Sequence, residues 1–241
     1  MDPAWSGLQA ALAAAGLSLP GGALEGLVAL HDLVQAAGER QNLTRITTPA
    51  DWAEKHALDA LLGLMCLPDD GDPLVDVGSG GGVPGLVLAL ARPAWRVTLV
   101  ESERRKAEFL EEACQALGLA DRVVVRAERA ERVGRDPTAR ERHGASVARA
   151  VAAVAPCLEL TLPLVRVGGR VVLYRGPSEA AGDLEVARRV APLLGGGAPT
   201  LHALALPSGA RRALLVVPKV AATPDRFPRR EGIPTKRPLD G

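Results

Sequence analysis

Short apolar runs alternate with longer amphipathic segments along the chain from residue 74 onward. This alternation is typical of a mostly parallel sheet whose two faces are covered by helices. The apolar runs predict seven strands, over residues 74–77, 96–101, 122–125, 145–148, 170–174, 200–206 and 210–217. The segments between them predict helices, over residues 84–91, 103–118, 154–165 and 179–194.

Glycine and proline mark where two of these elements begin or turn. Gly168 and Gly169 announce the strand at 170–174. Pro207-Ser208-Gly209 is too short for a crossover, so the last two strands should be antiparallel neighbours. A terminal hairpin of this kind differs from the six parallel strands of a dinucleotide-binding sheet, and it favours the doubly wound α/β sheet of methyltransferases.

Three helical segments precede the sheet, over residues 5–15, 23–37 and 51–66. The second has apolar residues along one face at helical spacing, so we expect these helices to pack together and onto the sheet. Thr48 is placed to cap the third helix, with Pro49 in its first position. We expect the exposed face of that helix to carry Lys55, His56 and Asp59.

The glycine-rich segment at 74–85 joins the first strand to its helix, and its main-chain N–H groups can bind a polar ligand. Gly80, Gly82 and Gly85 match G-x-G-x-x-G, which is weak evidence alone. Asp76 would repel a pyrophosphate but attract the sulfonium and ammonium groups of S-adenosylmethionine. A second interpretation, in which Asp76 only caps the turn, stays open.

Acidic residues after the next two strands fit a nucleoside. Glu101 ends the second strand about 20 residues after the glycine turn, where a carboxylate can accept hydrogen bonds from both ribose hydroxyls. A doubled Arg-Ala-Glu at 126–131 follows the third strand, beside the expected position of adenine. The spacing does not say which copy meets the adenine, and surface ion pairs are an alternative for either copy.

Arg149 follows the fourth strand, at the rim where open α/β sheets bind ligands. An arginine among alanines needs a partner, so we expect it to contact the methionine carboxylate or a nucleotide. Pro156-Cys157 resembles the nucleophile of cytosine-C5 methyltransferases, but it lies too far along the chain, inside an apolar helix. A buried core cysteine is therefore the favoured interpretation.

No Asn-Pro-Pro-Tyr or Asp-Pro-Pro-Tyr motif follows the fourth strand, so the proton-handling element of adenine-N6 enzymes is missing. A ring nitrogen such as guanine N7 has a lone pair and no proton to lose, and its methylation needs alignment rather than a general base. The four histidines show no metal-ligand spacing, and we predict no metal site. His56 is a candidate substrate contact.

The composition narrows the class of protein. With 241 residues, of which 47% are hydrophobic, the chain can bury one α/β core. A net charge of +1 leaves any RNA affinity to local basic patches. Three cysteines without C-x-x-C spacing indicate a reducing cytosol. No apolar run approaches the roughly 18 residues of a membrane span, so we expect a soluble cytoplasmic protein.

The last part of the chain, residues 219–241, is rich in proline and carries six basic residues against three acidic ones. It is either a basic patch that contacts RNA or a solvated, partly disordered end. We therefore divide the chain into an N-terminal helical extension at 1–66, the sheet domain at 67–218 and this tail at 219–241.

Several motifs in this order resemble the 16S ribosomal RNA guanine-N7 methyltransferase family called RsmG or GidB. They are Asn42-Leu43-Thr44, His56-x-x-Asp59, the glycine turn, Glu101-Ser102 with Arg104-Arg105-Lys106 and Phe109-Leu110, Arg129-Ala130-Glu131, Arg149-Ala150, and Phe227-Pro228-Arg229-Arg230-Glu231-Gly232-Ile233-Pro234. One departure is Tyr174-Arg175-Gly176, where the family usually has Leu-Lys-Gly. Arginine keeps the charge but not the point-like geometry of an ammonium.

The resemblance implies a doubly wound, seven-stranded class I (Rossmann-like) sheet that binds S-adenosylmethionine, and methyl transfer to guanine N7 in the 530 loop of 16S rRNA. It implies cofactor contacts at Asp76, Gly78, Gly80, Val83, Glu101, Ser102, Glu103, Ala130, Glu131 and Arg149, the last also positioning the reactants. It favours the second Arg-Ala-Glu copy for the adenine. The implied substrate contacts are Asn42, His56, Arg175, Arg229 and Arg230.

The implied partner is 16S rRNA, in a 30S subunit or an assembly intermediate, bound by a protein that we expect to be a monomer without membrane association. Two alternatives stay open: a small-molecule methyltransferase, and a non-catalytic RNA-binding module on the same fold. If the tail serves only RNA, deleting 219–241 should weaken RNA methylation with little change in cofactor binding.

Overall fold

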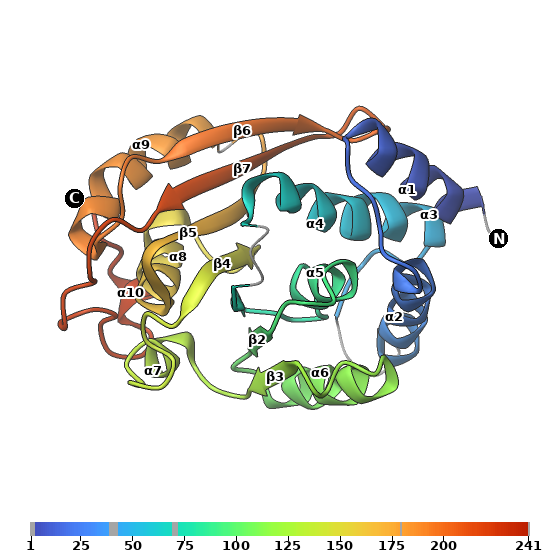
Figure 1. The fold of residues 1–241 in the computed structure, drawn as a ribbon. Coiled ribbons are helices and arrows are strands. Elements are labelled where there is room, and N and C mark those ends of the chain that lie inside the picture. Colours follow the sequence, from blue (N-terminus) through green and yellow to red (C-terminus); the bar gives the residue numbers. More distant parts are fainter. Residues whose placement is uncertain (1–2, 39–42, 69–71, 179, 241) are drawn as a thin grey trace.

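The computed structural model describes residues 3–38, 43–68, 72–178 and 180–240, and within them the chain forms one seven-stranded sheet with helices on both faces (Figure 1). The strand order is β3-β2-β1-β4-β5-β7-β6, and the pairs among β1 to β5 are parallel while β7 runs antiparallel to both β5 and β6. The strands are β1 (Leu74–Val77), β2 (Val97–Val100), β3 (Val123–Arg126), β4 (His143–Arg149), β5 (Val165–Arg175), β6 (Thr200–Ala205) and β7 (Arg211–Pro218). The predicted fold class and the terminal hairpin are confirmed.

Strand β5 begins five residues earlier than predicted, and Gly168 and Gly169 lie inside it. The prediction that these glycines precede the strand was wrong. Gly168 has a φ of +88°, and the pairing register with β4 shifts between His143 and Ala145. The glycines therefore form an irregularity within the strand, because a left-handed residue interrupts regular pairing without ending the strand.

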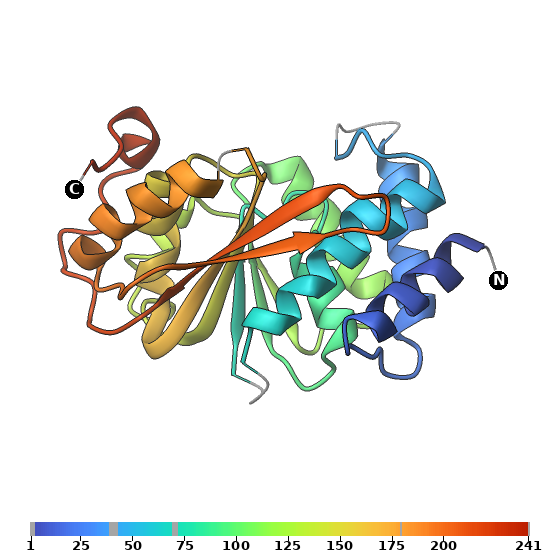
Figure 2. The same cartoon turned by 90° about the horizontal axis from the view of Figure 1, so that it is seen from above.

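The helices form two layers, one on each side of the sheet (Figure 2). One layer holds α5 (Gly85–Ala91), α6 (Arg104–Ala116) and the helices of the N-terminal extension, which share a hydrophobic core. The other holds α7 (Ala130–Val133), α8 (Val154–Thr161) and α9 (Ala180–Val190), together with the short α10 (Ile233–Lys236), which packs on α8.

The N-terminal extension comprises α1 (Pro3–Ala14), α2 (Ala23–Gly38) and a long helical segment made of α3 (Pro49–Trp52), a π-helical turn (Ala53–Leu58), α4 (Asp59–Leu62) and a 3-10 turn (Gly63–Cys66). The predicted cap is confirmed: the Thr48 side chain accepts a hydrogen bond from the Asp51 N–H, and Pro49 opens the helix.

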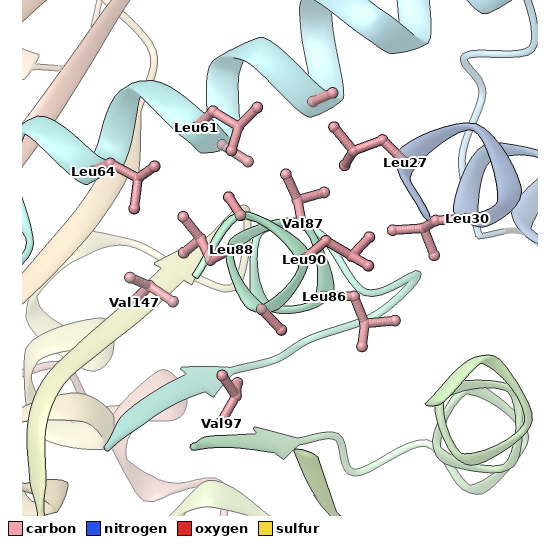
Figure 3. Close-up of a cluster of buried hydrophobic side chains, with 14 of the residues drawn as sticks. Leu27, Leu30, Leu61, Leu64, Leu86, Val87, Leu88, Leu90, Val97 and Val147 are labelled. Atoms are coloured by element: carbon pink, nitrogen blue, oxygen red, sulfur yellow. The ribbon is translucent and has the colours of Figure 1, made fainter. Parts of the chain in front are cut away.

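Helix α5 is buried on every side, because the extension covers the face that points away from the sheet. Leu27 and Leu30 of α2 and Leu61 of α4 pack around Val87 and Leu90 of α5 (Figure 3). The extension thus completes the layer that supports the glycine turn, which leads directly into α5.

A row of aromatic rings runs through the extension toward the sheet. Successive ring centroids lie 6.0 Å, 5.6 Å and 6.0 Å apart, in the order Trp5, His31, Trp52 and His56. All three contacts are edge-on, the favoured arrangement of aromatic pairs. The row places His56 against Trp52, whose side chain is completely buried.

The tail is an ordered part of the fold over its described residues. The Lys219 side chain is fully buried, where its Nζ donates to the Leu162 carbonyl and lies 3.0 Å from Glu141 Oε1. Arg140 donates to the carbonyls of Thr223 and Phe227. The alternative of a partly disordered end is therefore wrong for residues 219–240, because buried polar contacts hold this segment to the sheet domain, although many of its other side chains are exposed to solvent.

Candidate functional site

A cavity of about 440 Å³ opens where β4, β1, β2 and β3 end side by side. Parallel strands bring the residues that follow them to one edge of the sheet, and this edge is where open α/β sheets bind ligands. The cavity is therefore lined by the ends of four strands that lie far apart in the sequence, together with residues of the N-terminal extension. Its lining includes the predicted Gly78, Gly80, Val83, Glu101, Ser102, Ala130, Glu131, His56 and Arg149.

The glycine turn after β1 takes its shape from left-handed residues. Gly78 has a φ of +73° and Gly80 a φ of +54°, and a Cβ on Gly78 would lie 2.5 Å from a methyl of Val151. Any residue other than glycine would be strained at these positions, and a side chain at residue 78 would also collide with Val151, which follows β4. The turn therefore presents main chain directly to the cavity.

Asp76 lies beneath this turn and does not line the cavity. Its side chain is completely buried, and Oδ2 accepts a 2.9 Å hydrogen bond from the Gly85 N–H at the start of α5. A Cβ on Gly85 would come within 2.6 Å of that oxygen, so the last glycine of the motif admits the carboxylate. Burial raises the pKa of Asp76 to about 7. The predicted direct contact with a cationic cofactor group is corrected: Asp76 has the capping role.

Glu101 faces the cavity at the end of β2 and is held by two main-chain donors. Oε2 accepts from the Gly80 N–H at 2.9 Å, and Oε1 accepts from the Glu103 N–H at 2.8 Å. A carboxylate oxygen can accept two hydrogen bonds, so both oxygens keep capacity for a ligand. The Glu103 side chain pairs instead with Lys106 at 2.7 Å and does not line the cavity, so its predicted cofactor contact is corrected to a main-chain role.

The two Arg-Ala-Glu copies differ in what their carboxylates contact. Glu128 binds the Arg126 guanidinium at 2.7 Å. Glu131 is 2% exposed, and its Oε1 accepts from the Gly232 N–H at 2.8 Å. Glu131 Oε2 is buried and has no hydrogen-bond partner among the described residues. A buried acceptor without a partner at the wall of a cavity is available to a ligand, and this acceptor, Glu131 Oε2, belongs to the second copy.

The tail contributes to the same end of the cavity, which the sequence did not indicate. Thr235 of α10 is one of the lining residues. Arg229 anchors this segment, because its guanidinium pairs with the completely buried Glu159 through contacts of 2.7–3.1 Å. The predicted substrate contact of Arg229 is thus corrected to a structural ion pair, whereas Arg230 is exposed.

Arg149 stands at the opposite end of the cavity, in a network with the N-terminal extension. Nη1 donates to the Lys55 carbonyl and to Asp59 Oδ2, both at 3.1 Å, and Nη2 donates to His56 Nδ1 at 2.9 Å. The next residue, Ala150, has a φ of +56°, a strained conformation that is common where a site fixes the main chain. Arg149 therefore links the strand end to the helix that carries His56.

His56 is neutral and half-buried. A guanidinium can only donate, so Nδ1 is the acceptor from Arg149, and the ring proton sits on Nε2 and points to Thr44 Oγ1 at 2.7 Å. Burial, with the adjacent Arg149 charge, lowers the pKa of His56 to about 4. The predicted exposed face is corrected: Asp59 is buried and His56 is covered, because Arg149 reaches over both from β4.

A second cavity, of about 270 Å³, adjoins the first and shares Arg149 and Ala150 with it. It lies at the ends of β4 and β5, where Arg149 and Tyr174 are paired in register. Arg175 lines it but is not freely exposed, since its Nε binds Asp183 Oδ2 at 2.6 Å. This carboxylate comes from α9 and covers the guanidinium, and the predicted substrate contact of Arg175 stays a prediction.

Several remaining predictions concern single residues. Asn42 lies outside the described residues, although the next two residues of its motif, Leu43 and Thr44, line the first cavity. Cys157 is buried, and burial raises the pKa of its thiol to about 11, which confirms a core cysteine rather than a nucleophile. No cluster of potential metal ligands occurs among the described residues. No helix in the described part of the chain is long and apolar enough to cross a bilayer.

The polar groups of the first cavity fit an adenosine with a charged amino-acid arm. The cavity has the size of a typical small-ligand site. It offers acceptors with spare capacity at Glu101 and Glu131 and a guanidinium at Arg149, in the order of the strands that carry them. A nucleoside needs acceptors for its ribose hydroxyls and amino group, and a carboxylate needs a cation.

Comparisons with known proteins agree with this chemistry. The family model "GidB: rRNA small subunit methyltransferase G" matches residues 23–204. Proteins named ribosomal RNA small subunit methyltransferase G are similar over most of their length: 44% identity to that of Pelotomaculum thermopropionicum (87% of each chain) and 41% to that of Symbiobacterium thermophilum (96% of each chain).

Solved structures share the fold at low sequence identity. An O-methyltransferase from Bacillus cereus, in complex with SAH, aligns with a TM-score of 0.59 and 16% identity over 91% of this chain and all of that one. The O-methyltransferase TomG from Streptomyces achromogenes, in complex with SAM, aligns with a TM-score of 0.55 and 19% identity over 80% of this chain and 90% of that one.

Proposed function

The chain belongs to the rRNA small subunit methyltransferase G (GidB) family, and we propose that it methylates N7 of a guanine in the 530 loop of 16S rRNA. It is an S-adenosylmethionine-dependent rRNA methyltransferase. The observation that carries the proposal is the row of strand ends: acceptors at Glu101 and Glu131, and a guanidinium at Arg149, in one cavity.

We assign the parts of the cofactor to this row in strand order. Glu131 and Ala130 take the adenine after β3, since Glu131 Oε2 is an acceptor without a partner among the described residues. Glu101 takes the ribose hydroxyls after β2. Gly78 and Val83 of the glycine turn line the cavity after β1, and Arg149 faces the methionine end after β4.

When bound, S-adenosylmethionine supplies an electrophilic methyl group. Guanine N7 presents a lone pair and carries no proton, so methyl transfer to it needs no general base. His56 supports this proposal, because both nitrogens of its neutral ring already have partners: Nδ1 accepts from Arg149, and Nε2 contacts Thr44 Oγ1. The histidine therefore positions these neighbours and does not act as a base. The chain contributes alignment and charge.

The partner follows from the same proposal. We propose that the substrate is 16S rRNA in a 30S subunit or an assembly intermediate, that the enzyme acts as a cytoplasmic monomer, and that exposed Arg230 is a contact for the RNA. Asn42, beside the lining residues Leu43 and Thr44, is proposed as a substrate contact on its position in the sequence.

Mass-spectrometric mapping of methylated guanines tests the proposal. Small-subunit rRNA from cells that lack this protein should lose one N7-methylguanine in the 530 loop and regain it when the gene is restored. Purified protein with labelled S-adenosylmethionine should label 30S particles, assembly intermediates or naked rRNA. Methylation at another position would overturn the assignment of the base, and labelling of none of these would contradict rRNA as the substrate.

A further inference from the structure

The second cavity meets the first at Arg149 and Ala150, next to the end where the methyl group is expected. Since the cofactor occupies the row from β3 to β4, the space at the ends of β4 and β5 is left for the group that receives the methyl. An RNA base enters such a space only when it is unstacked and turned out of its strand. The hydrogen-bonding groups that line this second cavity therefore determine which base can bind there.

One carboxylate and three guanidinium groups are among the residues that line it. The carboxylate is Asp59, whose side chain is 7% exposed; Oδ2 accepts from Arg149 at 3.1 Å, and Oδ1 lies 3.4 Å from Arg212 Nε. Burial raises the pKa of Asp59, and the positive charges of Arg149 and Arg212 oppose this effect. Each oxygen can accept two hydrogen bonds, so Oδ1 in particular keeps capacity for a donor.

The edge of guanine carries, in order, the N7 lone pair, the O6 acceptor, the N1–H donor and the N2 amino donor. With N7 directed into the first cavity, O6 comes next, toward Arg149. That guanidinium has five N–H donors, of which the contacts with Lys55, Asp59 and His56 use three. The two donors of the base then fall on the side of Asp59.

We propose that Asp59 is the residue that selects guanine, by accepting hydrogen bonds from N1–H and the N2 amino group while Arg149 donates to O6, with Arg212 as a positioning residue for the Asp59 carboxylate. Adenine would place an amino donor against the guanidinium and an unprotonated N1 against the carboxylate, so it mismatches at both positions. This inference rests on the proposed function, which supplies the guanine.

The test uses small-subunit rRNA assembled by ligation, with guanosine or inosine at the position that the wild-type enzyme methylates. Inosine lacks only the N2 amino group. The wild type should methylate the guanosine RNA with a kcat/KM about tenfold or more above that of the inosine RNA, because a buried acceptor loses its donor. In Asp59→Asn this ratio should fall severalfold. Inosine also changes the reactivity of N7, but that effect is the same for both enzymes and cancels in the comparison.

Asp51→Asn is the matched control, since Asp51 precedes Asp59 in the same helical segment, is half-exposed and pairs with Lys55. It should keep the wild-type ratio. A structural role of Asp59 would lower both rates equally and leave the ratio unchanged, which would overturn the proposal. If Asp59→Asn fails to bind S-adenosylmethionine, Arg212→Gln provides the second variant: it should also lower the ratio, and an unchanged ratio would again count against selection by Asp59. Loss of wild-type activity on the guanosine RNA would instead contradict the proposed function itself.

Discussion

The carboxylate of Glu101 both shapes the site and faces its ligand. Its two oxygens hold the N–H groups of Gly80 and Glu103, so the glycine turn and the start of α6 are fixed through one side chain. A change at this residue therefore acts on the ribose contact and on the turn together.

Glu101→Gln should raise the Kd for S-adenosylmethionine by about 5- to 150-fold, because one acceptor oxygen becomes a donor facing donors, at a cost of roughly 1–3 kcal/mol. Isothermal titration calorimetry measures this Kd. Glu103→Gln is the matched control, since its side chain pairs with Lys106 and does not itself line the cavity, and it should bind the cofactor as the wild type does. Equal losses in both variants would contradict the assignment of Glu101.

The folded state opposes protonation of His56, whose pKa is about 4 against a usual 6.5. Between these values the unfolded chain binds more protons than the folded one, so this residue makes the free energy of unfolding fall as the pH is lowered from about 6.5 to 4. His56→Gln should lessen that fall, measured by urea denaturation at pH 5 and pH 7.5. The exposed His202→Gln should leave it unchanged, and a His56→Gln variant with the full wild-type pH dependence would refute the neutral, buried state.

Residue spacing placed Glu101, both Arg-Ala-Glu copies and Arg149 near one edge of the sheet, because parallel strands bring their carboxyl ends together. The choice of Ala130 and Glu131 came from the family resemblance. The partners of Arg149 could not be found from spacing. Lys55, His56 and Asp59 come from the extension, and their distance to Arg149 depends on how the extension packs on the sheet. Asp76 had two chemically sensible roles, and only its complete burial decides between them.

At the scale of elements, the tail is a basic segment that also packs on the sheet domain and supports the wall of the cavity. Arg229 pairs with buried Glu159, the Gly232 N–H binds Glu131, and Thr235 lines the cofactor cavity. Deletion of 219–241 should therefore weaken cofactor binding as well as RNA methylation, contrary to what its basic composition predicts.

Arg229→Ala should destabilise the protein by about 3–5 kcal/mol, because it leaves the buried Glu159 carboxylate without its partner. Arg230→Ala, at the exposed neighbouring position, should change the free energy of unfolding by less than about 0.5 kcal/mol. Chemical denaturation of both variants checks this pair. If the two variants lost equal stability, the Arg229–Glu159 pair would not be what holds the tail.

Element positions were mostly predictable because apolar periodicity reports burial, and the terminal hairpin followed from its short turn. The start of β5 was not, since Gly168 and Gly169 are equally compatible with a loop and with an irregular strand. The structural role of the tail could not be predicted either, because a run of charged residues is typical of a solvent-exposed segment. In the structure, Lys219 and Arg229 pair with acidic residues that lie more than 60 residues away in the chain.

For the whole molecule, the N-terminal extension and the sheet share one hydrophobic core. The same cluster of buried side chains contains Trp5 and Leu27 of the extension, Leu88 of α5 and Val216 of β7. The division at residue 66 stays a prediction about sequence organisation, and we expect the two parts to unfold together.

Leu27→Ala should lower the free energy of unfolding by about 2–5 kcal/mol and shift the transitions of circular dichroism and of cofactor binding equally, because it opens a void in the shared core. Met65→Ala, at a side chain that is 56% exposed, is the control and should have little effect. Two separate transitions in either protein would show that the extension is an independent unit.

The row of aromatic rings places a fluorescent side chain, Trp52, near the end of the site where methyl transfer is expected. The chain has three tryptophans, and Trp52 is the one whose ring lies 6.0 Å from His56, which in turn accepts a hydrogen bond from Arg149. A ligand that binds Arg149 should change the electrostatic field at the Trp52 indole. When Trp5 and Trp95 are replaced by phenylalanine, the remaining tryptophan fluorescence comes from Trp52 alone. Cofactor and RNA binding can then be followed in stopped-flow time courses without any label.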